Sequence, residues 1–323
     1  MKLPTFDEFI DKLKHFDRKM LSKAFTLNES TLEIHNDLFD SILNALKPVE
    51  DQALVIGITG IPGVGKSTFI ESFGSYLHQL GKKIAVFAID PSSQNTQGSI
   101  LGDKTRMEQL SRLPNVFIRP SPSSNQLGGL GLNTHKNIAL AKAIGFDIIL
   151  VETVGVGQSE TMVKELCDLF LLLMMPGSGD ELQGVKKGIM EMANLLIVHK
   201  ADGELIEAAE KSKKELEAAL HYTRDHSDEN AVFLYSSLTQ KNADAIWNWM
   251  ERWILNRKKN LDFYKNRKKQ DEFWFDYEWK QLLIKHISET HRDTLNDLQS
   301  EITKGNFISR KQIVDRILYQ SYL

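Results

Sequence analysis

The sequence has little of what would indicate a disulfide-stabilised protein or a thiolate metal centre. Its 323 residues contain a single cysteine, Cys167. One cysteine cannot form a disulfide within the chain, and by itself it cannot make a thiolate metal site. We expect Cys167 to be a buried residue of a helix.

Long apolar runs and an excess of one charge are also missing. The longest uninterrupted apolar run, residues 169–175, is too short to cross a bilayer. Three acidic residues, Asp7, Glu8 and Asp11, follow Met1 closely, which is not the pattern of a secretory signal peptide. The net charge of −3 does not indicate the basic surface that is typical of proteins that bind nucleic acid. We therefore expect a cytoplasmic protein that binds neither nucleic acid nor a membrane.

Strand-like apolar runs alternate with amphipathic helical runs along most of the chain. This alternation predicts an α/β fold in which a mainly parallel sheet lies between helices. In such a sheet, ligands bind beyond the carboxyl ends of the strands, so the residues that follow each strand are the candidates for function. Strands are expected at residues 54–58, 84–90, 116–118, 147–153, 169–175, 195–199 and 232–236.

The most informative segment is GIPGVGKS, residues 60–67, which follows the first strand pattern and runs into a helix pattern. Strand, glycine-rich loop and helix in this order are typical of a P-loop NTPase. The glycines let successive backbone N–H groups point at a polyphosphate, and the helix N-terminus adds partial positive charge. Lys66 can reach the β- and γ-phosphates as a catalytic cation, and the Ser67 hydroxyl is placed to bind Mg²⁺. The expected nucleotide contacts are Gly60, Ile61, Pro62, Gly63, Val64, Gly65, Lys66, Ser67 and Thr68.

A long polar loop, residues 90–107, follows the second strand. A loop of this length is uncommon in a compact domain unless it has a function. Asp90 and Asp103 suit a mobile switch segment that helps to hold Mg²⁺ and senses the γ-phosphate. Arg106 is the nearest candidate for an arginine that stabilises phosphoryl transfer, and a structural ion pair with Asp103 is the alternative.

The fourth strand runs into VETVGVGQSE. Glu152 is placed to contact Mg²⁺ directly or through water, and Gly155 allows a backbone N–H group to approach the γ-phosphate. Gln158 is a candidate for orienting the attacking water, although Val156 occupies the place where a glutamine usually follows the switch glycine. The alternative is that Gln158 caps the following helix.

Base selection is assigned to HKAD, residues 199–202, after the sixth strand. Guanine-specific proteins normally have Asn-Lys-x-Asp here, in which the aspartate accepts hydrogen bonds from guanine N1 and the amino group. Asp202 and Lys200 keep their roles, but His199 replaces the asparagine, so the contact to guanine N7 is made by an imidazole N–H or is lost. Guanine stays favoured because adenine lacks the two donors that Asp202 needs. The backbone of a following segment could contact the base oxygen: Ser236, Ser237 and Leu238.

Together these segments resemble the MeaB/ArgK family of SIMIBI-class P-loop GTPases. Its members are called methylmalonyl-CoA mutase-associated GTPases and were formerly labelled LAO/AO transport ATPases. The matching segments span roughly residues 54–240, and their combination is far more specific than any one of them. They are TGIPGVGKST, AIDPSS, GSILGDKTRM, FIRPSPSS, VETVGVGQSE, PGSGDELQGVKKGIME and HKAD.

The resemblance implies a homodimeric GTPase that uses GTP/GDP and Mg²⁺, with Ser67, Asp90, Asp103 and Glu152 around the metal. It also implies that residues 177–188 form a third switch, which relays the nucleotide state to the mutase. The relay candidates are Asp180, Glu181, Gln183, Lys186 and Lys187. An ordinary strand-to-helix turn is the alternative, in which the two acids favour the N-terminus of the new helix.

Helical segments flank the nucleotide-binding part. Thr5 and Glu8 match a capping box that opens one helix, and a second helix is expected up to residue 46. Beyond residue 255, basic and aromatic residues mix with leucines at helical spacing, and Ser309 is expected to cap a further helix. We expect an N-terminal helical extension at residues 1–50, a G domain at 51–255 and a C-terminal helical arm at 256–323. The resemblance implies that this arm dimerises.

The function that the resemblance implies is a chaperone of adenosylcobalamin-dependent methylmalonyl-CoA mutase, whose GTP hydrolysis gates cofactor loading and protects the loaded mutase. A P-loop ATPase or kinase linked to amino-acid transport would not need HKAD. A metal-delivery GTPase would be expected to show a histidine or cysteine cluster, whereas the nine histidines are scattered. A module that binds nucleotide without hydrolysing it stays open, because the role of Gln158 has an alternative.

Overall fold

A computed structural model describes residues 5–47, 53–89, 107–121, 127–153, 159–177, 187–223 and 231–319. The chain divides into two compact units, residues 1–267 and 268–323.

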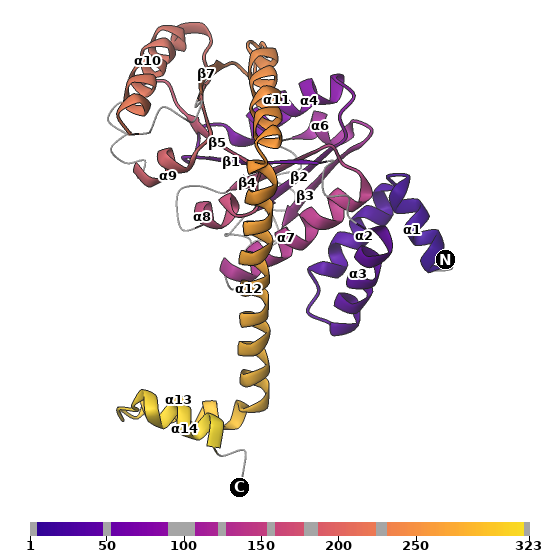
Figure 1. Cartoon of the computed structure of the whole chain (residues 1–323), viewed down its shortest axis with the longest axis vertical. Helices are drawn as coiled ribbons and strands as arrows, with labels where there is room; N and C mark the ends of the chain where they lie inside the picture. The colour runs from indigo at the N-terminus through magenta and orange to yellow at the C-terminus, as the bar shows by residue number, and fades with distance from the viewer. Residues whose placement is uncertain are drawn as a thin grey trace. The chain divides into compact units, whose positions relative to one another are not determined.

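The first unit is built on one sheet of seven strands in the order β3-β2-β4-β1-β5-β6-β7, and each pairing is parallel. The predicted parallel sheet is therefore confirmed. The central strands are buried along their whole length because helices cover both faces of the sheet, as Figure 1 shows. The strands are β1 (Leu54–Gly60), β2 (Ile84–Ile89), β3 (Val116–Ser121), β4 (Ile148–Thr153), β5 (Leu169–Met174), β6 (Leu195–His199) and β7 (Ala231–Tyr235).

One face of the sheet packs against α4 (Lys66–Gln79), α6 (Glu108–Arg112) and α11 (Ala243–Lys259) in a single apolar cluster. Four more helices follow strands or precede them: α7 (Leu127–Ile144), α8 (Ser159–Lys164), α9 (Lys187–Met192) and α10 (Ile206–Thr223). Cys167 is buried, as expected, but it lies in the turn after α8 and not in a helix. Burial raises the pKa of its thiol, so this cysteine is held as an unreactive apolar residue.

Three helices precede the sheet: α1 (Phe6–Lys14), α2 (Arg18–Asn28) and α3 (Glu33–Leu46). The capping box at Thr5 and Glu8 is confirmed, because each side chain accepts the other residue's backbone N–H. Only two helices were expected, and α2 is the addition. Its Phe25 ring lies 5.4 Å from Phe87 and 5.1 Å from Phe117, centroid to centroid, so α2 packs directly on β2 and β3.

The C-terminal part is helical, as predicted, and consists of α12 (Asp262–Thr290), α13 (Arg292–Thr303) and α14 (Arg310–Tyr319). In the second unit α13 and α14 lie side by side, which both figures show, and Arg316 pairs with Glu301 between them at 2.7 Å. The expected cap at Ser309 is confirmed, because its Oγ accepts the backbone N–H of Gln312. Among the helices within the described ranges, none combines the length and apolar character needed to span a membrane.

Candidate nucleotide-binding site

The glycine-rich loop connects β1 to α4 at the carboxyl end of the sheet. Gly60, Gly63 and Gly65 have φ values of +155°, +80° and +95°, a region that side-chain-bearing residues rarely adopt. A Cβ atom on Gly60 would lie 2.7 Å from the carbonyl oxygen of Leu173. Gly63 has open space around the same position. The loop therefore needs glycine both for its backbone conformation and for its approach to β5.

Lys66 is the first residue of α4 and is buried. Its Nζ donates hydrogen bonds to the carbonyl oxygens of Gly60 at 2.7 Å and Ile61 at 3.2 Å. These contacts hold the ammonium group against the glycine-rich loop. The cation thus lies where a polyphosphate wrapped by that loop would need a counter-charge.

Ser67 and Glu152 meet at the junction of α4 and β4. The Ser67 hydroxyl donates to the Glu152 carboxylate, Oγ to Oε1, at 3.0 Å, and Glu152 is 7% exposed. The neighbouring Thr153 hydroxyl bonds to Thr59 Oγ1 at 3.0 Å, which ties the ends of β4 and β1 together. A hydroxyl beside a carboxylate is a set of hard oxygen donors that fits Mg²⁺.

Most predicted switch residues lie outside the described residues: Asp90, Asp103, Arg106, Gly155, Gln158, Asp180, Glu181, Gln183 and Lys186. Lys187 is the first residue of α9. The strands that precede these segments are β2, β4 and β5. All three run parallel to β1, with β2 and β4 on one side of it and β5 on the other, so their carboxyl ends lie at the same edge of the sheet as the glycine-rich loop.

The HKAD segment follows β6 and contacts the glycine-rich loop. Lys200 has a φ of +58°, and its Nζ donates to the carbonyl oxygen of Gly63 at 3.0 Å. The Asp202 carboxylate accepts a hydrogen bond from the Ser236 hydroxyl, which fixes one of its oxygens. Leu238 is 83% exposed. The structure therefore brings the predicted base-recognition residues of two distant segments beside the predicted phosphate loop.

His199 is buried and contacts both the glycine-rich loop and the segment after β7. Its Nδ1 lies 2.8 Å from the carbonyl oxygen of Val64, and its Nε2 lies 2.7 Å from Ser237 Oγ. A Cβ atom on Gly65 would lie 2.8 Å from the imidazole Cε1, so glycine at this position also makes room for the histidine ring. Burial lowers the pKa of His199, which favours the neutral imidazole.

Sequence reasoning missed a polar cluster behind His199. The Ser72 hydroxyl lies 2.8 Å from the Tyr235 hydroxyl and donates to the carbonyl oxygen of Ser237 at 3.0 Å. Gln240 donates to the carbonyl oxygen of Ser72 at 3.1 Å. Burial raises the pKa of Tyr235 to about 12, so the phenol stays protonated. Because the cluster joins α4 to the segment after β7, no local sequence pattern could have indicated it.

Lys66 and Ser67 open the helix that follows the glycine-rich loop, and the Lys-x-Asp segment contacts that loop through Lys200. This arrangement defines a P-loop NTPase. Residues 21–292 match the family described as "Methylmalonyl Co-A mutase-associated GTPase MeaB". The chain belongs to this family and is a GTPase.

Known relatives agree with this assignment. GTPase ArgK of Escherichia coli is 45% identical over 245 residues, which are 75% of this chain and 74% of that protein. The mouse protein named "Methylmalonic aciduria type A homolog, mitochondrial" is 38% identical over 303 residues, 89% of this chain and 73% of the relative. The crystal structure of an LAO/AO transport system kinase superposes with a TM-score of 0.74 at 31% identity, covering 100% of this chain and 99% of that one. The predicted fold, with helices flanking a P-loop domain, is therefore confirmed.

Proposed function

We propose that this GTPase is a Mg²⁺-dependent chaperone of adenosylcobalamin-dependent methylmalonyl-CoA mutase, which gates cofactor loading and protects the loaded mutase in the cytoplasm. The observation that carries the nucleotide part is the convergence of Lys66, the Ser67–Glu152 pair and Lys200 around one loop. The mutase part is supported by the name of the family to which the chain belongs.

The first step in this proposal is the grip on the triphosphate. The backbone N–H groups from Gly60 to Thr68 and the N-terminus of α4 bind the phosphate oxygens. On GTP binding, the Lys66 ammonium group exchanges the carbonyl oxygens of Gly60 and Ile61 for the β- and γ-phosphates. The ammonium group then offsets the negative charge that develops on the phosphates during transfer.

Ser67 and Glu152 would hold the metal, and Asp90 and Asp103 are the proposed further ligands. When bound, Mg²⁺ neutralises charge on the β- and γ-phosphates. The buried carboxylate of Glu152 also keeps the Ser67 hydroxyl oriented, since the two groups are already 3.0 Å apart. Arg106, Gln158 and Gly155 are proposed to complete the γ-phosphate environment.

Asp202 is proposed to select guanine. Its carboxylate is held by Ser236, and Lys200 lies against the loop with its stem available to cover the base. An adenine base would leave this carboxylate facing an acceptor and not two donors. The site should therefore reject ATP, and failure of ATP to bind would also exclude a role as a transport ATPase or kinase.

A metal-delivery role is not supported, because no group of three or more histidine, cysteine or acidic residues suited to a metal occurs in the part of the chain that the structure describes.

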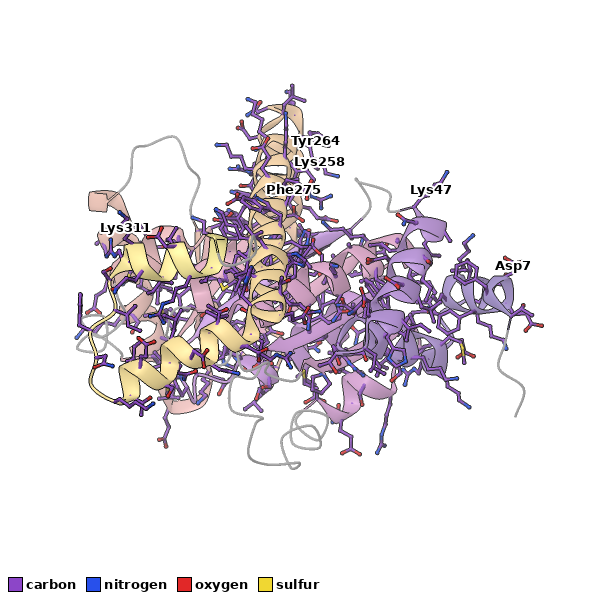
Figure 2. The ribbon with its side chains drawn as sticks, turned by 90° about the horizontal axis from the view of Figure 1, so that it is seen from below. Asp7, Lys47, Lys258, Tyr264, Phe275 and Lys311 are labelled. Atoms are coloured by element: carbon purple, nitrogen blue, oxygen red, sulfur yellow. The ribbon has the colours of Figure 1, made fainter. Side chains whose placement is uncertain are left out.

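The relay to the partner is proposed to use Asp180, Glu181, Gln183, Lys186 and Lys187, which join β5 to α9. The homodimer is proposed to use the C-terminal arm. On α12, Phe275, Trp279 and Leu282 are 72%, 43% and 59% exposed within the single chain, and Phe275 is marked in Figure 2. Their spacing of four and then three residues places them on one face of the helix. A contiguous exposed apolar face is typical of a helix that packs against another protein.

The chaperone proposal is tested by adding purified adenosylcobalamin-dependent methylmalonyl-CoA mutase to the purified GTPase. We expect a complex by analytical ultracentrifugation and a higher kcat for GTP hydrolysis in the complex. A cobalamin enzyme of another acyl-CoA substrate is the matched control. If the mutase neither binds nor changes kcat, the chaperone role is wrong while the GTPase assignment stands.

A further inference from the structure

His199 occupies the position at which guanine-specific proteins normally carry an asparagine, and its two ring nitrogens contact two separate segments of this protein. Nδ1 reaches the carbonyl oxygen of Val64 in the phosphate loop, at 2.8 Å. Nε2 reaches the hydroxyl of Ser237, after β7, at 2.7 Å. The imidazole thus bridges the loop that binds phosphate and the segment that flanks the base.

The direction of each hydrogen bond follows from its partner. A carbonyl oxygen can only accept, so Nδ1 carries the hydrogen and donates to Val64. In a neutral imidazole Nε2 is then the acceptor, and the Ser237 hydroxyl donates to it. The burial of the ring is consistent with the neutral form.

The ring is also held from its faces and its edge. Tyr235 stacks on it at a centroid distance of 6.1 Å with an interplanar angle of 19°, and Phe69 meets it edge to face at 87°. Gly65 lies against the Cε1 edge. A rotation that turned either nitrogen toward a base would break both hydrogen bonds and this packing.

An asparagine side chain could bridge and read the base at once, because its amide has two N–H donors and an oxygen with two lone pairs. An imidazole has one in-plane site on each nitrogen, and both are used here. We propose that His199 is a positioning residue that joins the phosphate loop to the segment after β7, and that this GTPase recognises guanine without a contact from His199 to N7. The inference rests on the proposal that GTP binds at this site.

The probe is 7-deaza-GTP, in which N7 is replaced by a C–H group. Wild-type protein should bind GTP and 7-deaza-GTP with Kd values within about 3-fold of each other in the presence of Mg²⁺, whereas an N7 hydrogen bond would separate them by about 10-fold. Inosine triphosphate, which keeps N7 but lacks the amino group that Asp202 needs, should bind at least about 10-fold more weakly than GTP.

Two variants separate positioning from base contact. His199→Asn supplies a second N–H group and should create a preference for GTP over 7-deaza-GTP of about 5-fold or more. Ser237→Ala removes only the partner hydroxyl and should weaken both nucleotides by the same factor of about 3 to 10. Thermal melting shows whether each variant is folded.

A tenfold preference of the wild-type protein for GTP over 7-deaza-GTP would overturn the inference and leave the proposed function intact. If 7-deaza substitution changes the Kd of neither wild-type protein nor His199→Asn by more than about 3-fold, the absence of an N7 contact from His199 is supported and the explanation based on the amide's second N–H is wrong. If no guanine nucleotide binds at all, the proposed function itself is wrong. A ¹⁵N spectrum of the histidine ring should show a protonated Nδ1 and an unprotonated Nε2; the opposite tautomer would contradict the assignment.

Discussion

Ser67 and Glu152 show how much of a metal site can be predicted from single residues in the sequence. Each was predicted as a Mg²⁺ ligand from its own motif, and the structure places their oxygens 3.0 Å apart although 85 residues separate them in the chain. His199 was visible in the sequence only as a departure from the usual tetrad. Its partners, Val64 and Ser237, come from two other segments, so its bridging contacts required the folded structure.

Glu152→Gln tests the metal role at the residue scale. The amide oxygen can still accept the Ser67 hydroxyl, so the fold should be retained, but the charge that favours Mg²⁺ is lost. We expect the Mg²⁺ concentration for half-maximal GTP hydrolysis to rise by about 10-fold or more. The measurement is a Mg²⁺ titration of GTPase activity, with the exposed Glu215→Gln on α10 as control. An unchanged Mg²⁺ requirement would exclude Glu152 from the metal site.

His135 on α7 makes stability depend on pH. Burial, with smaller effects from Lys142 and Lys136, lowers its pKa from 6.5 to about 4. The unfolded chain therefore binds more protons between these two values, and stability decreases as the pH falls through this window. The loss is up to about 3 kcal/mol at pH 4, and none is expected above pH 7. Urea unfolding of wild-type protein and His135→Gln from pH 7 to pH 4 should give a shallower dependence for the variant; parallel curves would contradict this.

At the scale of elements, the features that could be predicted from the sequence are those formed within one short segment of the chain. The strands are short apolar runs, and the glycine-rich loop with its strand and helix is one continuous segment, so both could be placed from the sequence. Helix α2 was missed although Asp17 caps it by accepting the N–H groups of Lys19 and Met20. What secures α2 is the packing of Phe25 on β2 and β3, which no local pattern shows.

The glycine-rich loop gives a matched pair of variants. Gly63→Ala and Gly65→Ala both place a side chain at positive φ, which costs about 1–2 kcal/mol. Only at Gly65 would the new Cβ meet the His199 ring, at 2.8 Å. Gly65→Ala should therefore lower the Tm by several degrees more than Gly63→Ala and should weaken GTP binding more strongly. Equal decreases in Tm for the two variants, measured by calorimetry, would show that a Cβ atom at residue 65 does not crowd the His199 ring.

At the scale of the whole molecule, the family and the fold are established, whereas the way in which GTP hydrolysis acts on a partner is a proposal. The family match covers residues 21–292, and the solved relative aligns with the full chain. Domain boundaries at residues 50 and 255, the dimer and the mutase partner stay predictions. The dimer and the mutase partner depend on contacts between chains, and a single chain's composition and periodicity specify those contacts only indirectly.

Binding of a guanine nucleotide by the loop from Gly60 to Ser67, with Lys66 as the counter-charge, is the central prediction for this GTPase. Isothermal titration calorimetry of GTP and ATP into the purified protein with Mg²⁺ tests it directly, with Lys66→Ala beside the exposed control Lys211→Ala. We predict one GTP per chain and ATP binding weaker by at least about 10³-fold, because adenine offers Asp202 neither of the two N–H donors of guanine. Lys66→Ala should lose roughly 100-fold in affinity, and Lys211→Ala should match the wild type. Equal binding of ATP and GTP, or unchanged affinity in Lys66→Ala, would contradict the account.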